Sequence, residues 1–183
     1  MIDATRLEAL AAHEHDLAPD ECAALAREVA ALVDLTALDR AGEGSFDLLW
    51  RNSHSEAWLN QWWALRDTGF HDHSGSCVGV HVLEGSARNE ALVIGGERHI
   101  REYGAGDSFS FPGTGIHRME HDRGAVTIHV YSPPITRSDT TTSSMASCAG
   151  SPDRRTRALR RAQVSRRHSP NRRGYTAEAS SSA

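Results

Sequence analysis

The sequence predicts a mainly β domain, a small barrel or sandwich preceded by helices, and three observations favour this class. Short segments rich in β-branched and aromatic residues recur from residue 46 onward. Gly, Asp, Asn or Pro separates these segments, as at turns between neighbouring strands. Helical periodicity is confined to the first 45 residues, so no helix falls between the strands. This order argues against a parallel sheet built from alternating strands and helices.

Two helices are expected before the strands. Apolar residues recur at steps of three and four from Cys22 to Val33, and Pro19 suits the first turn of that helix. A shorter apolar pattern from Leu7 to Ala11 indicates a preceding helix. Two glycines between residues 41 and 45 then end the helical part of the chain.

The strand segments complete the predicted organisation. Strands are expected at residues 57–65, 77–83, 90–94, 108–111 and 125–131. The chain therefore divides into a helical segment at 1–45, a barrel at 46–135 and a remainder at 136–183. We expect the helical segment to pack on the barrel.

The net charge of -4 averages two unlike segments. All 20 basic residues are Arg; residues 1–135 hold 10 Arg and 21 acids, or -11, and residues 136–183 hold 10 Arg and 3 acids, or +7. Segment 136–183 also contains a Thr/Ser run and four Arg doublets, which predicts a disordered tail. Its single aromatic residue is Tyr175, so we do not expect the basic tail to bind nucleic acid.

The sequence shows no membrane span, secretory signal or disulfide framework, and this predicts where the protein is located. No run approaches the roughly 20 apolar residues of a membrane span. Acids and histidines stand near the N-terminus, where a secretory signal would carry a basic stretch and an apolar block. Cys22, Cys77 and Cys148 lie far apart and form no CxxC pair, which favours reduced thiols. We expect a cytoplasmic monomer that makes no membrane contact.

Histidines carry most of the functional information, since ten of the eleven precede residue 136. His71 and His73 are two residues apart, so on an extended segment both rings project from one face, as a shared metal requires. An isolated pair of this kind is more often two unrelated histidines. Here a Gly turn, a short strand and a Pro/Gly turn at residues 106–116 lead to a third, His117. We expect the remaining histidines, including His121, to lie in solvent. The exceptions are His81, which is expected in a strand, and His129.

The segments around these three histidines resemble the cupin superfamily, in which an HxH pair and a later His point into the mouth of a small barrel. The usual cupin motif also supplies a glutamate four or five residues after the second His. Cys77 and Val78 stand there in this sequence. Three neutral imidazoles leave a divalent metal its full charge and open positions, which suit an anionic substrate such as a thiolate.

Four stretches narrow the resemblance to the cysteine dioxygenase family, in particular its bacterial members: Trp50-Arg51-Asn52, and residues 69–73 (GFHDH), 115–120 (GIHRME) and 128–134 (IHVYSPP). The resemblance implies a cupin barrel of the jelly-roll type that binds Fe(2+) through His71, His73 and His117. It also implies that Arg51 grips the substrate carboxylate, a task suited to a planar, permanently charged fork. Without these motifs, Arg51 would be interpreted as a surface residue paired with Asp47.

Thr127, His129 and Tyr131 match a Ser-His-Tyr relay of the family. Their two-residue spacing independently puts all three on one face of a strand. A Tyr and His that merely fill the core would show the same spacing. Animal members cross-link the tyrosine to a cysteine at the position of Val78; Cys77 is one residue earlier, so strand alternation turns it to the opposite face.

The function implied by the resemblance is that of a non-haem iron thiol dioxygenase, which oxidises L-cysteine with O2 to cysteine sulfinic acid. One alternative is a dioxygenase of 3-mercaptopropionate or another small thiol, because the iron site would be identical. Arg51 favours cysteine over these substrates. A second alternative, from another class, is a non-catalytic cupin that binds a metal or a small ligand.

Overall fold

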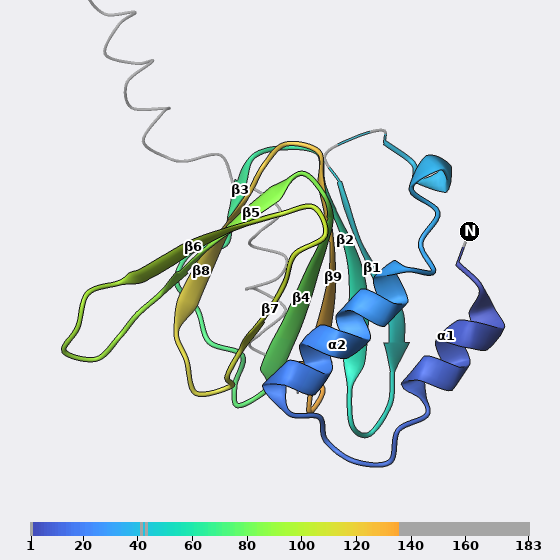
Figure 1. The fold of residues 1–183 in the computed structure, drawn as a ribbon, viewed down its shortest axis with the longest axis horizontal. Coiled ribbons are helices and arrows are strands. Elements are labelled where there is room, and N and C mark those ends of the chain that lie inside the picture. Colours follow the sequence, from blue (N-terminus) through green and yellow to red (C-terminus); the bar gives the residue numbers. More distant parts are fainter. Residues whose placement is uncertain (1, 41, 43, 136–183) are drawn as a thin grey trace, which may run out of the picture. The chain divides into compact units, whose positions relative to one another are not determined.

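Two β-sheets face each other in a cupin-like sandwich, and two helices precede them, which confirms the mainly β fold (Figure 1). The computed structural model describes residues 2–40, 42 and 44–135, so the predicted tail lies outside the described residues. The helices are α1 (Ala4–Ala11) and α2 (Pro19–Ala30), followed by the 3-10 turn η1 (Leu35–Ala37). The strands are β1 (Ser45–Arg51), β2 (Glu56–Trp62), β3 (Arg66–Asp67), β4 (Cys77–Glu84), β5 (Ser86–Ala91), β6 (His99–Gly104), β7 (Ser108–Phe111), β8 (His117–His121) and β9 (Ala125–Ser132).

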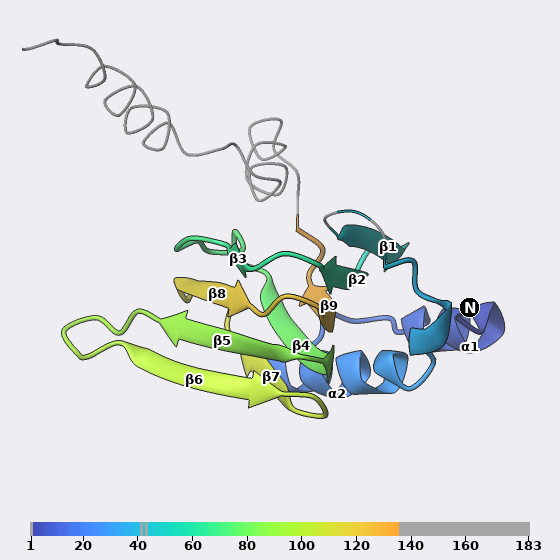
Figure 2. The same cartoon turned by 90° about the horizontal axis from the view of Figure 1, so that it is seen from above.

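The strands pair entirely in antiparallel ladders. One sheet has the order β1-β2-β9-β4-β7 and the other the order β3-β8-β5-β6 (Figure 2). The chain thus crosses repeatedly between the sheets, as in a sandwich whose two inner faces enclose the core. Strand β9 lies at the centre of the larger sheet, so side chains on its inner face are surrounded by protein.

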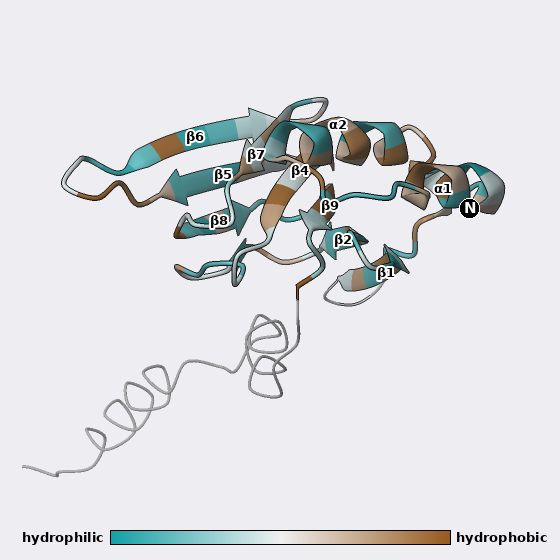
Figure 3. Cartoon of the chain, turned by 90° about the horizontal axis from the view of Figure 1, so that it is seen from below, coloured by the Kyte–Doolittle hydropathy of each residue, from teal (hydrophilic) through white to brown (hydrophobic). Residues whose placement is uncertain are grey.

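Both sheets differ in part from the sequence prediction. The strand expected at 90–94 is wrong in its bounds, because β5 ends at Ala91 and the apolar residues after it form the exposed tip of the β5–β6 hairpin (Figure 3). Ile94 is fully exposed there. Strands β1, β3, β6 and β8 were not expected, and the strand expected at 57–65 ends at Trp62. Strand β6 is an exposed edge strand, and β8 alternates buried with half-buried residues of mostly polar type, so neither shows an apolar run.

Helix α2 covers the outer face of the larger sheet, where it lies against β4, β7 and β9 (Figure 1). The Glu21 carboxylate accepts a hydrogen bond from the Ala18 amide at 2.7 Å and so caps the helix start. The buried side chains between helix and sheet are Cys22, Ala26, Val29, Ala30, Ala57, Leu59, Trp63, Cys77, Val126, Ile128 and Val130. No helix in the part of the chain described here is long and apolar enough to cross a membrane.

A second core lies between the two sheets. It consists of Val78, Val80, Val82, Ala87, Phe109, Phe111, Met119 and Tyr131. Strand β4 contributes to both cores, since Cys77 belongs to the outer cluster and Val78 to the inner one. The outer core therefore fastens the helix, and the inner face remains for polar side chains beside this apolar cluster.

Gly79 sets how closely α2 approaches β4. A Cβ at this position would lie 2.1 Å from the backbone nitrogen of Ala23 and 2.1 Å from the carbonyl carbon of Cys22. Gly79→Ala is therefore expected to push the helix away and to lower the free energy of unfolding by about 2 kcal/mol or more. Urea denaturation measures this; Gly104→Ala, where the nearest atom is 3.9 Å away, serves as the control and should change stability by under roughly 0.5 kcal/mol. Equal effects of the two substitutions would contradict this packing.

Candidate metal centre

Three imidazole rings converge at one end of the inner face. His71, His73 and His117 each offer a ring nitrogen, and these atoms lie within 4.8 Å of one another. The ring centroids are 5.1 Å apart for His71 and His73, 4.8 Å for His71 and His117, and 5.0 Å for His73 and His117. Within the described part of the chain this is the one such cluster of potential metal ligands, and it contains no carboxylate.

Backbone pairing brings two of these histidines together. The His71 amide donates to the His117 carbonyl at 2.8 Å, and the His117 amide donates to the His71 carbonyl at 3.0 Å. The two residues are thus direct cross-strand partners although they lie far apart in the sequence. His73 follows in an irregular segment before β4, and its ring turns toward the other two.

Hydrogen bonds orient two of the rings. The Nδ1 atom of His117 lies 2.7 Å from the Oδ1 atom of Asn89, and the Nδ1 atom of His71 lies 2.9 Å from the carbonyl oxygen of Gly69. Because both partners are acceptors, each Nδ1 carries the proton and each Nε2 presents its lone pair to the centre. Asn89, on β5, was not predicted from the sequence, since nothing in its local pattern marks it as the partner of a distant ring.

The two buried rings are held in their neutral form. Burial, together with smaller contributions from the neighbouring His73 and His71, lowers the pKa of His117 to about 3. Burial likewise lowers the pKa of His73 to about 4, with a smaller contribution in the same direction from His71. Their Nε2 atoms face each other at 3.4 Å. Ligand atoms about 2.1 Å from one metal are separated by about 3.0–3.4 Å, so these donors fit a shared divalent ion.

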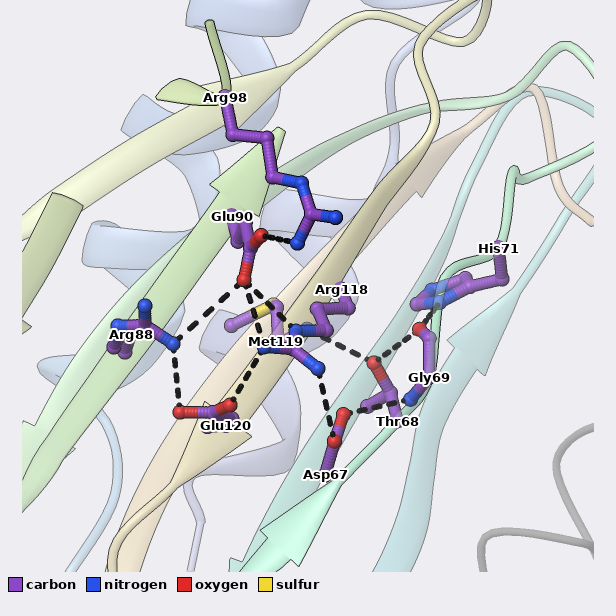
Figure 4. Close-up of polar contacts among 10 residues, drawn as sticks. All are labelled: Asp67, Thr68, Gly69, His71, Arg88, Glu90, Arg98, Arg118, Met119 and Glu120. Carbon is purple, nitrogen blue, oxygen red and sulfur yellow. Dashed lines mark hydrogen bonds and ion pairs between the residues drawn. The ribbon is translucent and has the colours of Figure 1, made fainter. Parts of the chain in front are cut away.

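A polar network supports His71, the most exposed of the three (Figure 4). The Gly69 carbonyl that accepts its Nδ1 proton also accepts from the Thr68 hydroxyl at 3.1 Å, and the Gly69 amide donates to Asp67 at 2.9 Å. Arg118 Nη1 lies 3.5 Å from the Asp67 carboxylate. Its Nε donates at 2.9 Å to Glu90, which also contacts Arg88 and Arg98. The network ties the segment before His71 to β5 and β8.

Thr127, His129 and Tyr131 share the inner face of β9, as their spacing predicts, and all three are buried. The Nδ1 atom of His129 lies 3.1 Å from the Tyr131 hydroxyl. The Tyr131 ring stands edge-on to the His73 ring at 5.1 Å between centroids, so it lies beside the histidine cluster. The Thr127 hydroxyl accepts a hydrogen bond from the indole of Trp62 at 3.0 Å.

Arg51 lies at the end of β1, on the same face as Tyr131. The register aligns Arg51 with Glu56 and Glu56 with Tyr131 across three neighbouring strands. The guanidinium pairs with the buried Glu56 carboxylate, with Nε and Nη2 each 2.5 Å from Oε2. The alternative interpretation, in which Arg51 pairs with Asp47 at the surface, is wrong, because the observed partner of Arg51 is Glu56. Glu56 itself was not predicted from the sequence, although its alternation with Ala57 on a strand could have marked it as facing inward.

Cys77 lies on the face opposite Tyr131. The register pairs Cys77 with Ser132 and Val78 with Tyr131, without a bulge between these pairs. The Cys77 thiol lies 3.7 Å from the Cys22 sulfur in the core beneath α2. Burial raises the pKa of Cys77, so its thiolate form is disfavoured. This arrangement separates the thiol from the Tyr131 hydroxyl, as strand alternation predicts.

His121 is not in solvent, which corrects the sequence prediction. It is 1% exposed, and its ring stacks on Trp62 with centroids 3.8 Å apart. Neither of its ring nitrogens has a hydrogen-bond partner among the described residues, and the same holds for the Nε2 atom of His129. Burial lowers the pKa of His121 to about 3. The two-residue alternation of His117, Met119 and His121 along β8 could have indicated its inward orientation.

Sequence comparison assigns the family. Residues 21–142 match the family model described as cysteine dioxygenase type I, which spans about two thirds of the chain. The chain belongs to the cysteine dioxygenase type I family. This confirms the resemblance inferred from the four sequence stretches. No curated protein sequence is significantly similar to the chain.

Solved structures of low sequence identity are also similar to this chain. A Bacillus halodurans protein is 17% identical with a TM-score of 0.47, and the match covers 54% of this chain and 76% of that one. KdgF from Halomonas sp. is 19% identical with a TM-score of 0.44, covering 56% and 88% of the two chains. An RmlC-like cupin protein from Desulfovibrio desulfuricans is 16% identical with a TM-score of 0.46, covering 55% and 93%.

The buried histidines predict how stability depends on pH. The pKa values of His73, His117, His121 and His129 are lowered from the ordinary 6.5, chiefly by burial. In the unfolded chain these groups bind protons as the pH falls below about 6.5, whereas in the folded chain His73, His117 and His121 do so only near pH 3–4. Burial lowers the pKa of His129 in the same direction. Stability of the metal-free protein is therefore fully present above pH 6.5 and is lost progressively as the pH falls.

His121→Gln is expected to remove one such contribution. The decrease in unfolding free energy between pH 6 and pH 5 should become smaller by roughly 1 kcal/mol per pH unit. Urea denaturation at several pH values, with a chelator present, measures this slope. His99→Gln, at an exposed site on β6, is the control and should leave the slope unchanged. An unchanged slope in His121→Gln would show that His121 is accessible to protons in the folded state.

Proposed function

We propose that this protein is a mononuclear iron thiol dioxygenase that oxidises L-cysteine with O2 to cysteine sulfinic acid. The observation that carries the proposal is the cluster of His71, His73 and His117 beside Tyr131, within a chain of the cysteine dioxygenase type I family. Three imidazoles without a carboxylate leave the charge of a divalent ion uncompensated. Such a centre attracts a thiolate, which matches the thiol substrate that the family implies.

The proposed site would hold Fe(2+) through the Nε2 atoms of His71 and His117, whose Nδ1 atoms are engaged elsewhere, together with His73. When bound there, iron supplies the Lewis acidity that favours the thiolate and the electrons that activate O2. The overall reaction is RSH + O2 → RSO2H, in which sulfur is oxidised and both oxygen atoms end on it. No further reductant is required.

Protein groups would orient the reactants and hold protons. Tyr131 would hydrogen-bond the substrate or oxygen, and its contacts support this role, because its ring lies against His73 and its hydroxyl against His129. His129 would set the direction of the Tyr131 proton, and Thr127, fixed by Trp62, would support the same strand face. Arg51 would bind the substrate carboxylate with the N–H groups that Glu56 leaves available.

Oxygen consumption by the iron-loaded protein with L-cysteine tests this function, with sulfinate measured as the product. Tyr131→Phe removes the hydroxyl and should lower kcat about 10²-fold at unchanged iron content. Tyr103→Phe, on β6 and stacked on Phe109, is the matched control and should retain the wild-type rate.

Other outcomes would assign the chain to the alternatives. Equal or faster turnover of 3-mercaptopropionate would overturn cysteine as the substrate and keep the dioxygenase reaction. A folded, iron-replete protein that consumes no O2 with any small thiol would overturn the enzymatic function and favour a cupin that only binds a metal or ligand.

A further inference from the structure

A buried carboxylate lies next to the proposed substrate anchor. Glu56 is 1% exposed, whereas the Arg51 side chain is 35% exposed. The Oε2 atom of Glu56 accepts a hydrogen bond from Arg51 Nε at 2.5 Å and lies 2.5 Å from Arg51 Nη2. The Oε1 atom of Glu56 accepts a hydrogen bond from the indole of Trp58 at 3.2 Å. Both carboxylate oxygens therefore have partners, and the negative charge of Glu56 is held in place.

The ion pair belongs to the same inner face as the histidine cluster. Glu56 is the direct partner of Tyr131 across the β2–β9 ladder, and Arg51 is the direct partner of Glu56 across the β1–β2 ladder. Neighbouring strands lie about 4.8 Å apart, so Glu56 stands one strand from Tyr131 and Arg51 two. The Tyr131 ring in turn contacts the His73 ring. A small thiol reaching from the histidines to Arg51 passes close to Glu56.

This placement changes the charge that a substrate meets. Arg51 alone would present a net positive charge, which attracts any thiol acid. Paired with Glu56 the two side chains are neutral together, and a substrate carboxylate bound to Arg51 lies near a second carboxylate. Glu56 repels the carboxylate of a substrate and attracts its ammonium group, and inside protein such effects are stronger than in water. For an amino acid the two contributions offset each other; for a thiol acid without an amine only the repulsion remains.

We propose that Glu56 is a specificity-determining residue that makes the pocket select zwitterionic amino thiols over anionic thiol acids. This inference rests on the proposed function, because it requires that small thiols bind between the histidines and Arg51. Glu56 discriminates by repelling the carboxylate of an anionic thiol, whereas Arg51 anchors a substrate carboxylate by attraction. The substrate class it assigns is a thiol that carries both an amine and a carboxylate.

A series of thiols of different charge tests the proposal. Cysteamine is cationic, L-cysteine is zwitterionic and 3-mercaptopropionate is anionic at neutral pH. In Glu56→Gln, affinity for 3-mercaptopropionate should rise about 10-fold relative to L-cysteine, and affinity for cysteamine should fall relative to L-cysteine. Dissociation constants are measured by anaerobic calorimetry on the iron(II)-loaded full chain, and kcat/KM for each thiol gives a second readout.

Three further variants separate charge from packing. Glu56→Asp retains the charge and should keep the wild-type order of the three thiols. Arg51→Gln leaves the carboxylate uncompensated and should shift the order in the opposite direction, against the anion. Glu84→Gln removes the acid of an exposed Arg40–Glu84 pair and should have no effect on the order. Thermal melts establish that each variant is folded.

The outcomes for this inference and for the proposed function are distinguishable. Three thiols that shift by the same factor in Glu56→Gln would overturn the specificity role and leave a packing role. If the thiol affinities shift in Glu56→Gln as expected but the wild-type protein consumes no O2, the dioxygenase function is overturned and the role of Glu56 is supported. Absence of thiol binding to the iron-loaded wild type would overturn both.

Discussion

The reciprocal backbone hydrogen bonds between His71 and His117 are the constraint on which the rest of the site depends. They align the segment before β4 with the start of β8 and so place two imidazoles side by side. The polar network through Gly69, Asp67 and Arg118 holds that segment, and Asn89 fixes the second ring. The local fold thus presents lone pairs toward a common point before any ion binds, which is the preorganisation that a metal site requires.

Segregation of the two cores makes this interior possible. The outer face of the larger sheet is covered by α2, whose close approach at Gly79 gives an apolar contact that stabilises the strands. The inner face combines an apolar cluster with polar residues, including His129 and Glu56. Burial keeps the His129 imidazole neutral, and a charged Glu56 is retained there because Arg51 compensates it.

Local patterns predicted the mainly β fold, α2 and the shared inner face of Thr127, His129 and Tyr131, because these follow from spacing along one element. Family motifs in the sequence predicted that His71, His73 and His117 form one cluster, and the structure places them together. Asn89 and the pairing of Arg51 with Glu56 could not be predicted in the same way, since each contact joins different strands through register. The apolar run at 92–94 misled the strand assignment because hydrophobicity alone does not show where a hairpin ends.

We expect His71, His73 and His117 together to bind one divalent metal. A crystal structure of the iron(II)-loaded protein, with anomalous diffraction recorded at the iron absorption edge, tests it most directly. A single peak is expected about 2.0–2.2 Å from one ring nitrogen of each of the three histidines, with the His71 and His117 bonds made by Nε2. Iron bound elsewhere, or no peak in a fully loaded crystal, would show that the three histidines do not form the metal site.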